Sequence, residues 1–253
     1  MNEAIRTIQD HRSIRQYTDE AVSDEHLDTI IQSAQSAASS INGQQVTIIS
    51  VQDKEKKKKL SELAGNQAWI DQAPLFLIFC ADFNRAKIAA ELNDAPLGVT
   101  DGLESILVGA TDAGISLEAA TVAAESLGLG TVPIGGIRRK PLEVIELLDL
   151  PEYVFPVSGL VVGHPSDHSA KKPRLPQAAV HHRESYNHDL KSLIQDYDAE
   201  MAEYMKKRTN GADDRNWSQT VSAIYKTIYY PEVRAMLEKQ GFKFEKGHHH
   251  HHH

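Results

Sequence analysis

The strongest candidate for binding chemistry is the segment from His11 to Arg15, HRSIR, which directly follows a short predicted helix. Two guanidinium groups, an imidazole and a hydroxyl lie within its five residues. This set favours an anion, because the planar fork of arginine matches a phosphate with two hydrogen bonds and serine adds a compact donor. An exposed basic turn that pairs with Asp10, Asp19 and Glu20 would explain the same residues, so a second observation is needed.

A second basic cluster, from Lys171 to Pro176 (KKPRLP), supplies that observation. Its two prolines stiffen the backbone, so that Lys172 and Arg174 can be held at a defined place. A flexible charged linker is the alternative. A reduced flavin requires a fixed cation beside N1 and the C2 carbonyl, and the phosphate of the cofactor requires another. Two separated basic clusters therefore suit a flavin nucleotide.

Three further segments could complete such a pocket. The segment from Ser39 to Gln44 offers short donors and acceptors after a predicted helix, and Gln67 offers an amide to a ring edge. The segment from Thr131 to Arg138 ends a strand with paired glycines, which allow the backbone to approach a flat ring. Each segment alone is explained equally well as an ordinary loop or tight turn.

Several well-defined motifs of other enzyme classes are missing from the sequence. The segment from Gly128 to Pro133 has proline where a dinucleotide fingerprint needs its third glycine, and it precedes a strand. There is no GxxxxGK[ST] loop and no GxSxG elbow, so P-loop hydrolysis and hydrolase-type serine catalysis lack support. Pro165 prevents a helix that would align His164 with His168, and no metal site is expected.

Hydrophobic periodicity places these segments between alternating helices and strands. The run Leu75–Ala81 has no alternating polar residue, which is typical of a strand buried on both faces. Three more strands are expected at Val46–Val51, Thr131–Ile134 and Val157–Val162. Helices are expected at Asp24–Ala37 with a Ser23 cap, Lys54–Leu63, Leu103–Leu127, from Pro141, and at 190–208 and 217–240.

Length and composition are those of a globular protein. The 253 residues end in a histidine tag at 248–253, and the single cysteine, Cys80, is expected to be a small buried hydrophobe. The net charge of −8 opposes nucleic-acid binding, and the basic run Lys56–Lys59 is expected to be a solvated helix face. No run approaches the roughly 18 apolar residues of a membrane helix and no signal peptide is recognised, which favours the cytoplasm.

The chain resembles the nitroreductase superfamily, specifically the NADPH-dependent, oxygen-insensitive group A nitroreductases and the related NADPH-flavin oxidoreductases. The resemblance covers nearly all of the 253 − 6 = 247 native residues. It depends on the order and spacing of HRSIR at 11–15, the serine pair at 39–40, Gln67, CADFNR at 80–85, AAESLGLG at 123–130, IGGIR at 134–138, KPRLP at 172–176 and AEY at 202–204.

The resemblance implies a non-covalent FMN site to which two subunits contribute. Its expected residues are His11, Arg12, Ser13, Arg15, Ser39, Ser40, Gln67, Pro133, Ile134, Gly135, Gly136, Arg138, Lys172 and Arg174. Arg15 and Arg174 are the expected phosphate partners, Lys172 is the cation near the flavin pyrimidine, and Ser39 with Ser40 come from the second subunit. Arg208, assisted by Arg215, is expected to favour the phosphate of NADPH, with NADH as an alternative donor.

The expected fold is α+β, with a mixed sheet of about four or five strands flanked by helices in an intertwined homodimer. Residues 1–247 are expected to form one domain, with an excursion and C-terminal helices at about 164–240. The resemblance implies ping-pong hydride transfer from NADPH to FMN and then to nitroaromatics, quinones, azo compounds or free flavin, with no side chain as acid or nucleophile. A non-enzymatic FMN-binding sensor and a flavin enzyme of different chemistry are the alternatives. Nucleic acid and membrane partners are not expected.

Overall fold

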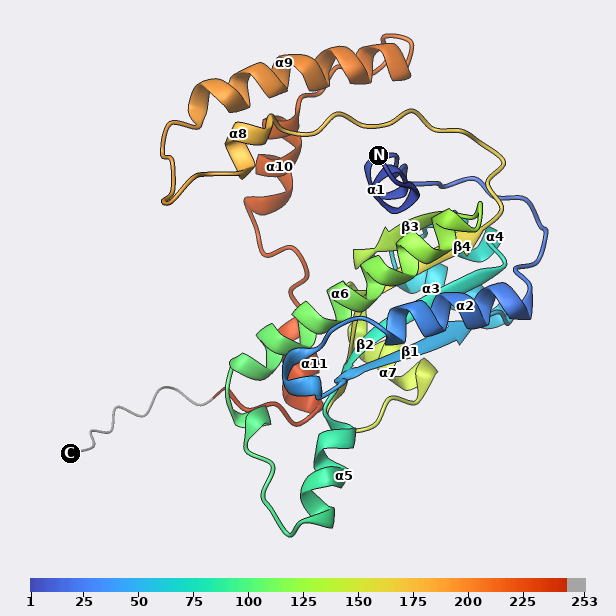
Figure 1. The fold of residues 1–253 in the computed structure, drawn as a ribbon, viewed down its shortest axis with the longest axis vertical. Helices are drawn as coiled ribbons and strands as arrows, with labels where there is room; N and C mark the ends of the chain where they lie inside the picture. Colours follow the sequence, from blue (N-terminus) through green and yellow to red (C-terminus); the bar gives the residue numbers. More distant parts are fainter. Residues whose placement is uncertain (245–253) are drawn as a thin grey trace. The chain divides into compact units, whose positions relative to one another are not determined.

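One antiparallel sheet organises the larger of two units into which the chain divides (Figure 1). The structure is a computed structural model that describes residues 1–244, so the tag predicted at 248–253 and the domain end predicted at 247 lie outside the described residues. The strand order is β1 (Val46–Val51), β2 (Leu75–Asp82), β4 (Val154–Gly163) and β3 (Gly130–Ile134). Every neighbouring pair is antiparallel, and the one parallel pairing within residues 1–244 is an isolated bridge between Ser13 and Thr131.

Strand β2 is buried along its whole length, as its sequence predicts. Successive side chains of a strand point to opposite faces of the sheet. Phe76, Ile78 and Cys80 accordingly belong to the hydrophobic cluster on one face, whereas Leu75, Leu77 and Phe79 belong to the cluster on the other. The sheet therefore needs a layer of helices on each side.

Two helices, α2 (Asp24–Gln35) and α6 (Glu104–Ser126), cover one face of the sheet (Figure 1). The predicted Ser23 cap is confirmed, because its side chain accepts a hydrogen bond from the backbone N–H of His26. Small residues bring α6 close to the sheet: a Cβ added at Gly109 would lie 2.8 Å from Cβ of Ala81. By length and hydropathy α6 alone among the described helices could cross a membrane, but its residues Ala113, Leu117, Ala120 and Ala124 are buried in the cluster on this face of the sheet.

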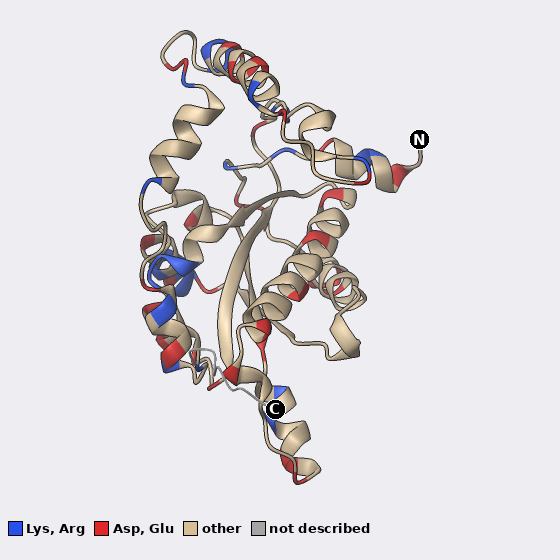
Figure 2. Ribbon diagram, turned by 90° about the vertical axis from the view of Figure 1, so that its left-hand side faces the viewer, with Lys and Arg blue, Asp and Glu red and all other residues tan. Residues whose placement is uncertain are grey.

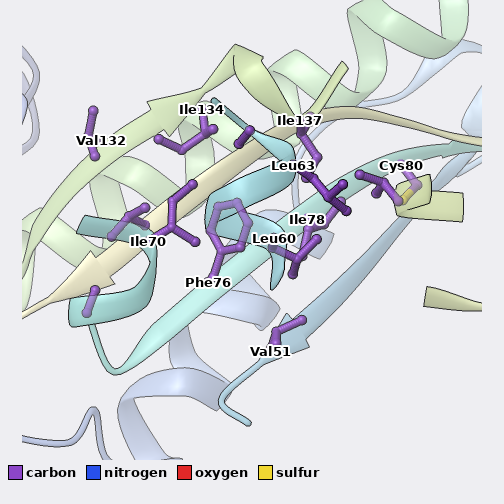
Figure 3. Close-up of a cluster of buried hydrophobic side chains, with 14 of the residues drawn as sticks. Val51, Leu60, Leu63, Ile70, Phe76, Ile78, Cys80, Val132, Ile134 and Ile137 are labelled. Carbon is purple, nitrogen blue, oxygen red and sulfur yellow. The ribbon is translucent and has the colours of Figure 1, made fainter. Parts of the chain in front are cut away.

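Three helices, α3 (Lys54–Leu63), α4 (Ala68–Gln72) and α7 (Pro141–Leu148), contribute to the cluster on the other face. Figure 3 shows Leu60, Ile70 and Phe76 meeting side chains of β3 and of the 3-10 turn η3 (Gly135–Arg138). Proline opens α7 as predicted. This layer places the start of α4 and the paired glycines of η3 close to one another, because Gly136 contacts both Ala64 and Gln67.

The basic run of α3, coloured blue in Figure 2, is not a uniformly solvated face. Lys57 is 4% exposed, which contradicts the prediction for Lys56–Lys59. The physical reason is helical periodicity: Lys57 lies on the same face as Leu60 and Ser61, both of which are buried. Its Nζ atom donates to the backbone carbonyl oxygens of Asp71 and Ala73, so this lysine caps the end of α4.

A third cluster lies at the end of the sheet where β2 and β4 pair through Ala81 and Phe155. It includes Met236 and Leu237 of α11 (Val233–Lys239) and is closed by Phe242, whose ring makes edge contacts with three aromatic neighbours. The remaining elements of this unit are α1 (Glu3–Gln9), η1 (Ser40–Asn42), α5 (Asn84–Leu92) and η2 (Val99–Asp101).

The second unit comprises residues Ala170–Tyr229, with α8 (Gln177–Val180), α9 (Lys191–Arg208) and α10 (Trp217–Tyr225). Within it, α9 and α10 are joined by the ring contact of Tyr197 with Trp217 and by the backbone N–H of Ser218, which donates to Asp198. The prediction of one helix at 217–240 is wrong, because the structure has two helices there, α10 and α11. Pro231 lacks an N–H and disfavours helical backbone before it, so α10 and α11 are separate.

Candidate functional site

The segment from His11 to Arg15 runs beside β3, where one buried side chain anchors it. Ser13 forms the bridge to Thr131, and the backbone N–H of Ile14 donates to the carbonyl oxygen of Thr131 at 2.9 Å. Ile14 is 7% exposed and packs against Gly130, where an added Cβ would lie 2.9 Å from Ile14. Because side chains alternate along an extended segment, burial of Ile14 turns Ser13 and Arg15 to the opposite side.

An acidic residue of α6 holds the imidazole of His11. The Nδ1 atom of His11 lies 2.9 Å from Oε2 of Glu125, and its Nε2 atom lies 3.4 Å from Oγ of Ser13. Arg12 lies on the other side of the segment, beside a pocket of about 360 Å3 that Arg6 and Glu125 also line. The carboxylate of Glu125 thus lies where α1, the segment from His11 to Arg15 and α6 meet, and its negative charge opposes the positive charge of Arg6 and Arg12.

Arg15 extends the cluster toward the start of α4. Its guanidinium carbon lies 5.7 Å from the ring centroid of Trp69, which is a cation–π distance. Two residues earlier, Gln67 is the N-cap of α4. The amide of Gln67 donates to the carbonyl oxygen of Ala64 at 2.7 Å, and Oγ of Ser61 donates to the carbonyl oxygen of Gln67 at 2.7 Å. The predicted ring-edge amide is therefore fixed at the start of α4, two residues before Trp69.

Paired glycines follow β3 where the sequence predicts a close approach of backbone. A Cβ at Gly136 would lie 2.7 Å from the carbonyl oxygen of Ala64 and 2.7 Å from Nε2 of Gln67, so only glycine fits. Pro133 is exposed and Ile134 is buried on the same short strand. Arg138 is engaged elsewhere: it donates to the carbonyl oxygen of Val157 and covers the ring of Tyr230 at 5.6 Å.

The predicted serine pair lies at the opposite edge of the sheet. Ser39 and Ser40 precede β1. Ser39 borders a pocket of about 510 Å3 between α2, β1 and α6, and both serines border a pocket of about 350 Å3 beside α6. The segment from His11 to Arg15 instead lies along β3, and β1 and β3 are the two edge strands of the sheet. Within one chain, the structure therefore brings His11, Ser13, Arg15, Gln67 and the glycines to one edge and leaves the serine pair at the other.

Four predicted site residues belong to the second unit. The guanidinium of Arg174 donates to the carbonyl oxygen of Lys172 at 3.2 Å, and the hydroxyl of Tyr197 donates to the carbonyl oxygen of Pro173 at 2.7 Å. Burial raises the pKa of Tyr197, which keeps this donor protonated. Arg208 is the last residue of α9, whereas Arg215 is bound by Asp213 at 3.0 Å, a contact that lowers the pKa of the aspartate.

The structure adds residues that sequence reasoning missed. Nε1 of Trp69 and Oγ1 of Thr131 are buried and have no hydrogen-bond partner within the described chain. Buried polar atoms are almost always hydrogen-bonded, and these two residues contact Arg15 and Ser13. Together with the basic side chains and the paired glycines, these two polar atoms fit a flat, polar ligand that carries a phosphate. FMN is a ligand of this kind. Glu125 lies within AAESLGLG, but no spacing in that motif revealed its pairing with His11.

Comparison with known proteins agrees with this geometry. Residues 8–164 match the nitroreductase family model, and residues 172–245 match the model of the C-terminal domain of that family. The FMN reductase [NAD(P)H] of Bacillus subtilis (strain 168) is 68% identical over 97% of this chain and 100% of its own length. The oxygen-insensitive NADPH nitroreductase of Salmonella typhimurium is 39% identical over 96% and 99%.

Solved structures give the same assignment. The hypothetical oxidoreductase YcnD from Bacillus subtilis has a TM-score of 0.96 and 68% identity, covering 97% of this chain and 100% of that one. The NADPH:FMN oxidoreductase from Vibrio harveyi, solved with NAD+, has a TM-score of 0.85 and 38% identity, covering 95% and 98%. The sheet, the segment beside β3 and these matches lead to one conclusion: the chain belongs to the nitroreductase family.

Proposed function

We propose that this protein is an FMN-dependent NAD(P)H oxidoreductase that passes hydride from a reduced nicotinamide to FMN and then to a small planar acceptor. The observation that carries the proposal is the HRSIR segment, which pairs with β3 and places Arg15 over the ring of Trp69. Nε1 of Trp69 and Oγ1 of Thr131, next to this segment, are buried without a hydrogen-bond partner in the described chain. The relatives named as FMN reductases and nitroreductases support an enzyme over a non-enzymatic sensor. Candidate acceptors are nitroaromatics, quinones, azo compounds and free flavin.

The chain's own residues bind and orient. Arg15 provides positive charge of the kind that a phosphate requires, and Gly136 leaves room for a ring. Lys172 and Arg174 are proposed as further cofactor-binding cations. When bound, FMN supplies the redox chemistry. Gln67 is fixed by Ala64 and Ser61, so it presents a rigid amide edge. No side chain needs to act as an acid or nucleophile in this scheme.

We further propose a homodimer. Ser39 and Ser40 lie at the β1 edge and the HRSIR segment at the β3 edge, so one flavin can be bound by both only if they come from two subunits. α6 supplies a contact surface, because Leu103 and Leu107 are each 64% exposed and Ile115 is 42% exposed. An exposed apolar stripe of this kind marks an interaction site.

The dimer is tested by light scattering on Leu107→Asp, with Ile88→Asp as control. Ile88 is 47% exposed on α5, so the control adds the same charge at an apolar surface position outside α6. We expect the Leu107 variant to become monomeric and to lose FMN, and the Ile88 variant to remain dimeric and yellow. A monomeric wild type that keeps its FMN would refute this part of the proposal.

Spectroscopy tests the central function. The purified protein should show a flavin spectrum, release intact FMN on denaturation and bleach rapidly when NADPH is added without oxygen. Protein that binds FMN but is not bleached by NADPH or NADH would be a sensor. Steady-state rates with a panel of acceptors would then separate flavin reduction, nitro reduction and other flavin chemistry.

The donor phosphate, domain limits and location complete the proposal. NADPH is proposed as the preferred donor through Arg208, with Arg215 assisting.

One domain with an excursion is supported by the path of the chain, which leaves the larger unit after Ser169 and returns at Tyr230. A cytoplasmic location is supported by the core packing of α6 and by the buried free thiol of Cys80, which suit a protein that works in reducing solution.

A further inference from the structure

The loop from Ser39 to Gln45 has an unusual backbone. Ile41, Asn42 and Gln44 have φ values of 52°, 55° and 51°, in the left-handed region that residues other than glycine rarely adopt. A β-branched residue such as Ile41 is a clear outlier there, and its side chain is 95% exposed, so packing of that side chain does not stabilise it. Strained backbone of this kind persists only when surrounding contacts fix it.

One carboxyl group of α6 contacts both ends of the loop. Oδ2 of Asp112 accepts the backbone N–H of Ser40 at 3.1 Å and the side-chain amide of Gln45 at 2.5 Å. The same amide of Gln45 also donates to the carbonyl oxygen of Ser40 at 3.3 Å. Asp112 therefore holds both ends of the strained turn at once.

Burial makes this anchor effective. Asp112 is 3% exposed and Gln45 is 8% exposed. The nearest cation around the adjoining pocket, Arg85, directs its guanidinium to Thr47, Asp82 and the carbonyl oxygens of Gln44 and Val46. A buried carboxyl group without its hydrogen bonds would be costly, so Asp112 stabilises the loop conformation that supplies the donors.

In this loop conformation the side chains of Ser39 and Ser40 have different surroundings. Oγ of Ser39 accepts the backbone N–H of Gln44 at 3.1 Å, whereas the side chain of Ser40 is exposed. Pockets of about 510 Å3 and 350 Å3 border the loop, and Asp112 and Ser39 line both. The second pocket also includes Leu107 and Ile115 of the exposed stripe of α6.

We propose that Asp112 is a positioning residue that holds the loop from Ser39 to Gln45 in the conformation in which Ser39 and Ser40 bind FMN. The pocket beside Asp112 is lined both by Ser39 and Ser40 of this loop and by Leu107 and Ile115 of α6. The inference depends on the proposed function in one respect: FMN must be the ligand that the serine pair binds.

The test compares Asp112→Asn with Ser116→Ala. Asn keeps the size of the side chain but loses the negative charge, so its one oxygen makes weaker hydrogen bonds to Ser40 and Gln45 than the carboxylate does. Ser116 lies one turn further along α6, is 4% exposed and donates to the carbonyl oxygen of Ala34, which lies outside residues 39–45. The dissociation constant of FMN is measured on each apoprotein by quenching of flavin fluorescence, and hydrogen exchange of the Ser40 amide is measured by mass spectrometry.

We expect Asp112→Asn to raise the dissociation constant about tenfold and to speed exchange in residues 39–45, with exchange in the rest of α6 unchanged. Ser116→Ala should match wild type in both measurements. Unchanged FMN affinity in Asp112→Asn, or an equal loss in both variants, would overturn the proposal. If the wild type binds no FMN, the proposed function itself fails.

Discussion

His11 and Glu125, 114 residues apart, lie in direct contact: Nδ1 of the imidazole is 2.9 Å from Oε2 of the carboxylate. The contact joins the segment after α1 to the last turns of α6. It also orients the ring, because with Nδ1 on Glu125 the Nε2 atom faces Oγ of Ser13 at 3.4 Å. Glu125 is therefore expected to control how His11 and Ser13 meet a ligand.

Glu125→Gln should weaken FMN binding by about fivefold, because the amide keeps the shape of the side chain but removes the carboxylate that orients the His11 ring. Titration of apoprotein with FMN measures this. Glu91→Gln, at an exposed position of α5, is the control and should bind FMN as wild type does. Equal affinity in wild type and Glu125→Gln would show that the contact has only a structural role.

Lys57→Met should destabilise the fold by about 1–3 kcal/mol, because two carbonyl oxygens at the end of α4 lose their donor. Lys58→Met, at an exposed position of the same helix, should change the free energy of unfolding by less than about 0.5 kcal/mol. Denaturant unfolding at neutral pH measures both values. Similar losses in the two variants would contradict the buried contact of Lys57.

The same lysine predicts a pH dependence. Burial lowers the pKa of Lys57 below its ordinary value of 10.5. Between the lowered pKa and 10.5 the unfolded chain binds more protons than the folded chain, so the contribution of this residue to stability rises with pH across that window. The free energy of unfolding of wild type minus that of Lys57→Met should therefore increase between pH 8 and pH 10. A flat or falling difference would contradict the shift.

Gly136→Ala should lower both FMN affinity and stability. The new methyl group would lie 2.7 Å from a backbone oxygen of Ala64, which cannot move as a flexible side chain could, and 2.7 Å from the amide of Gln67. Overpacking of this kind costs about 1–3 kcal/mol. Gly98→Ala is the control, since an added Cβ there meets no atom within 4 Å. Thermal unfolding and FMN titration would contradict the prediction if the two variants behaved alike.

Arg208→Ala should raise KM for NADPH by about tenfold and leave NADH kinetics and FMN content unchanged, because only NADPH carries a 2′-phosphate. Arg215→Ala should have a smaller effect, since Asp213 already binds the guanidinium of Arg215 at 3.0 Å. Steady-state kinetics with both donors decides between them. Equal loss with NADPH and NADH would mean that Arg208 supports the fold or the flavin instead.

Local patterns alone determined most of the secondary structure. The run Leu75–Ala81, the Ser23 cap and Pro141 predicted β2, α2 and α7, because burial period, capping and proline geometry act over a few residues. The sequence also identified HRSIR as a basic segment suited to binding an anion. These features need no knowledge of distant contacts.

Only the tertiary structure decided the relations between distant residues. Nothing local to Glu125, Trp69 or Asp112 states that they meet His11, Arg15 and Ser40, because those contacts cross 114, 54 and 72 positions of the chain. Nor could the sequence show that the serine pair and the HRSIR segment lie at opposite edges of one sheet. Strand order depends on how β1, β2, β4 and β3 pack their two buried faces, and that is a property of the whole core.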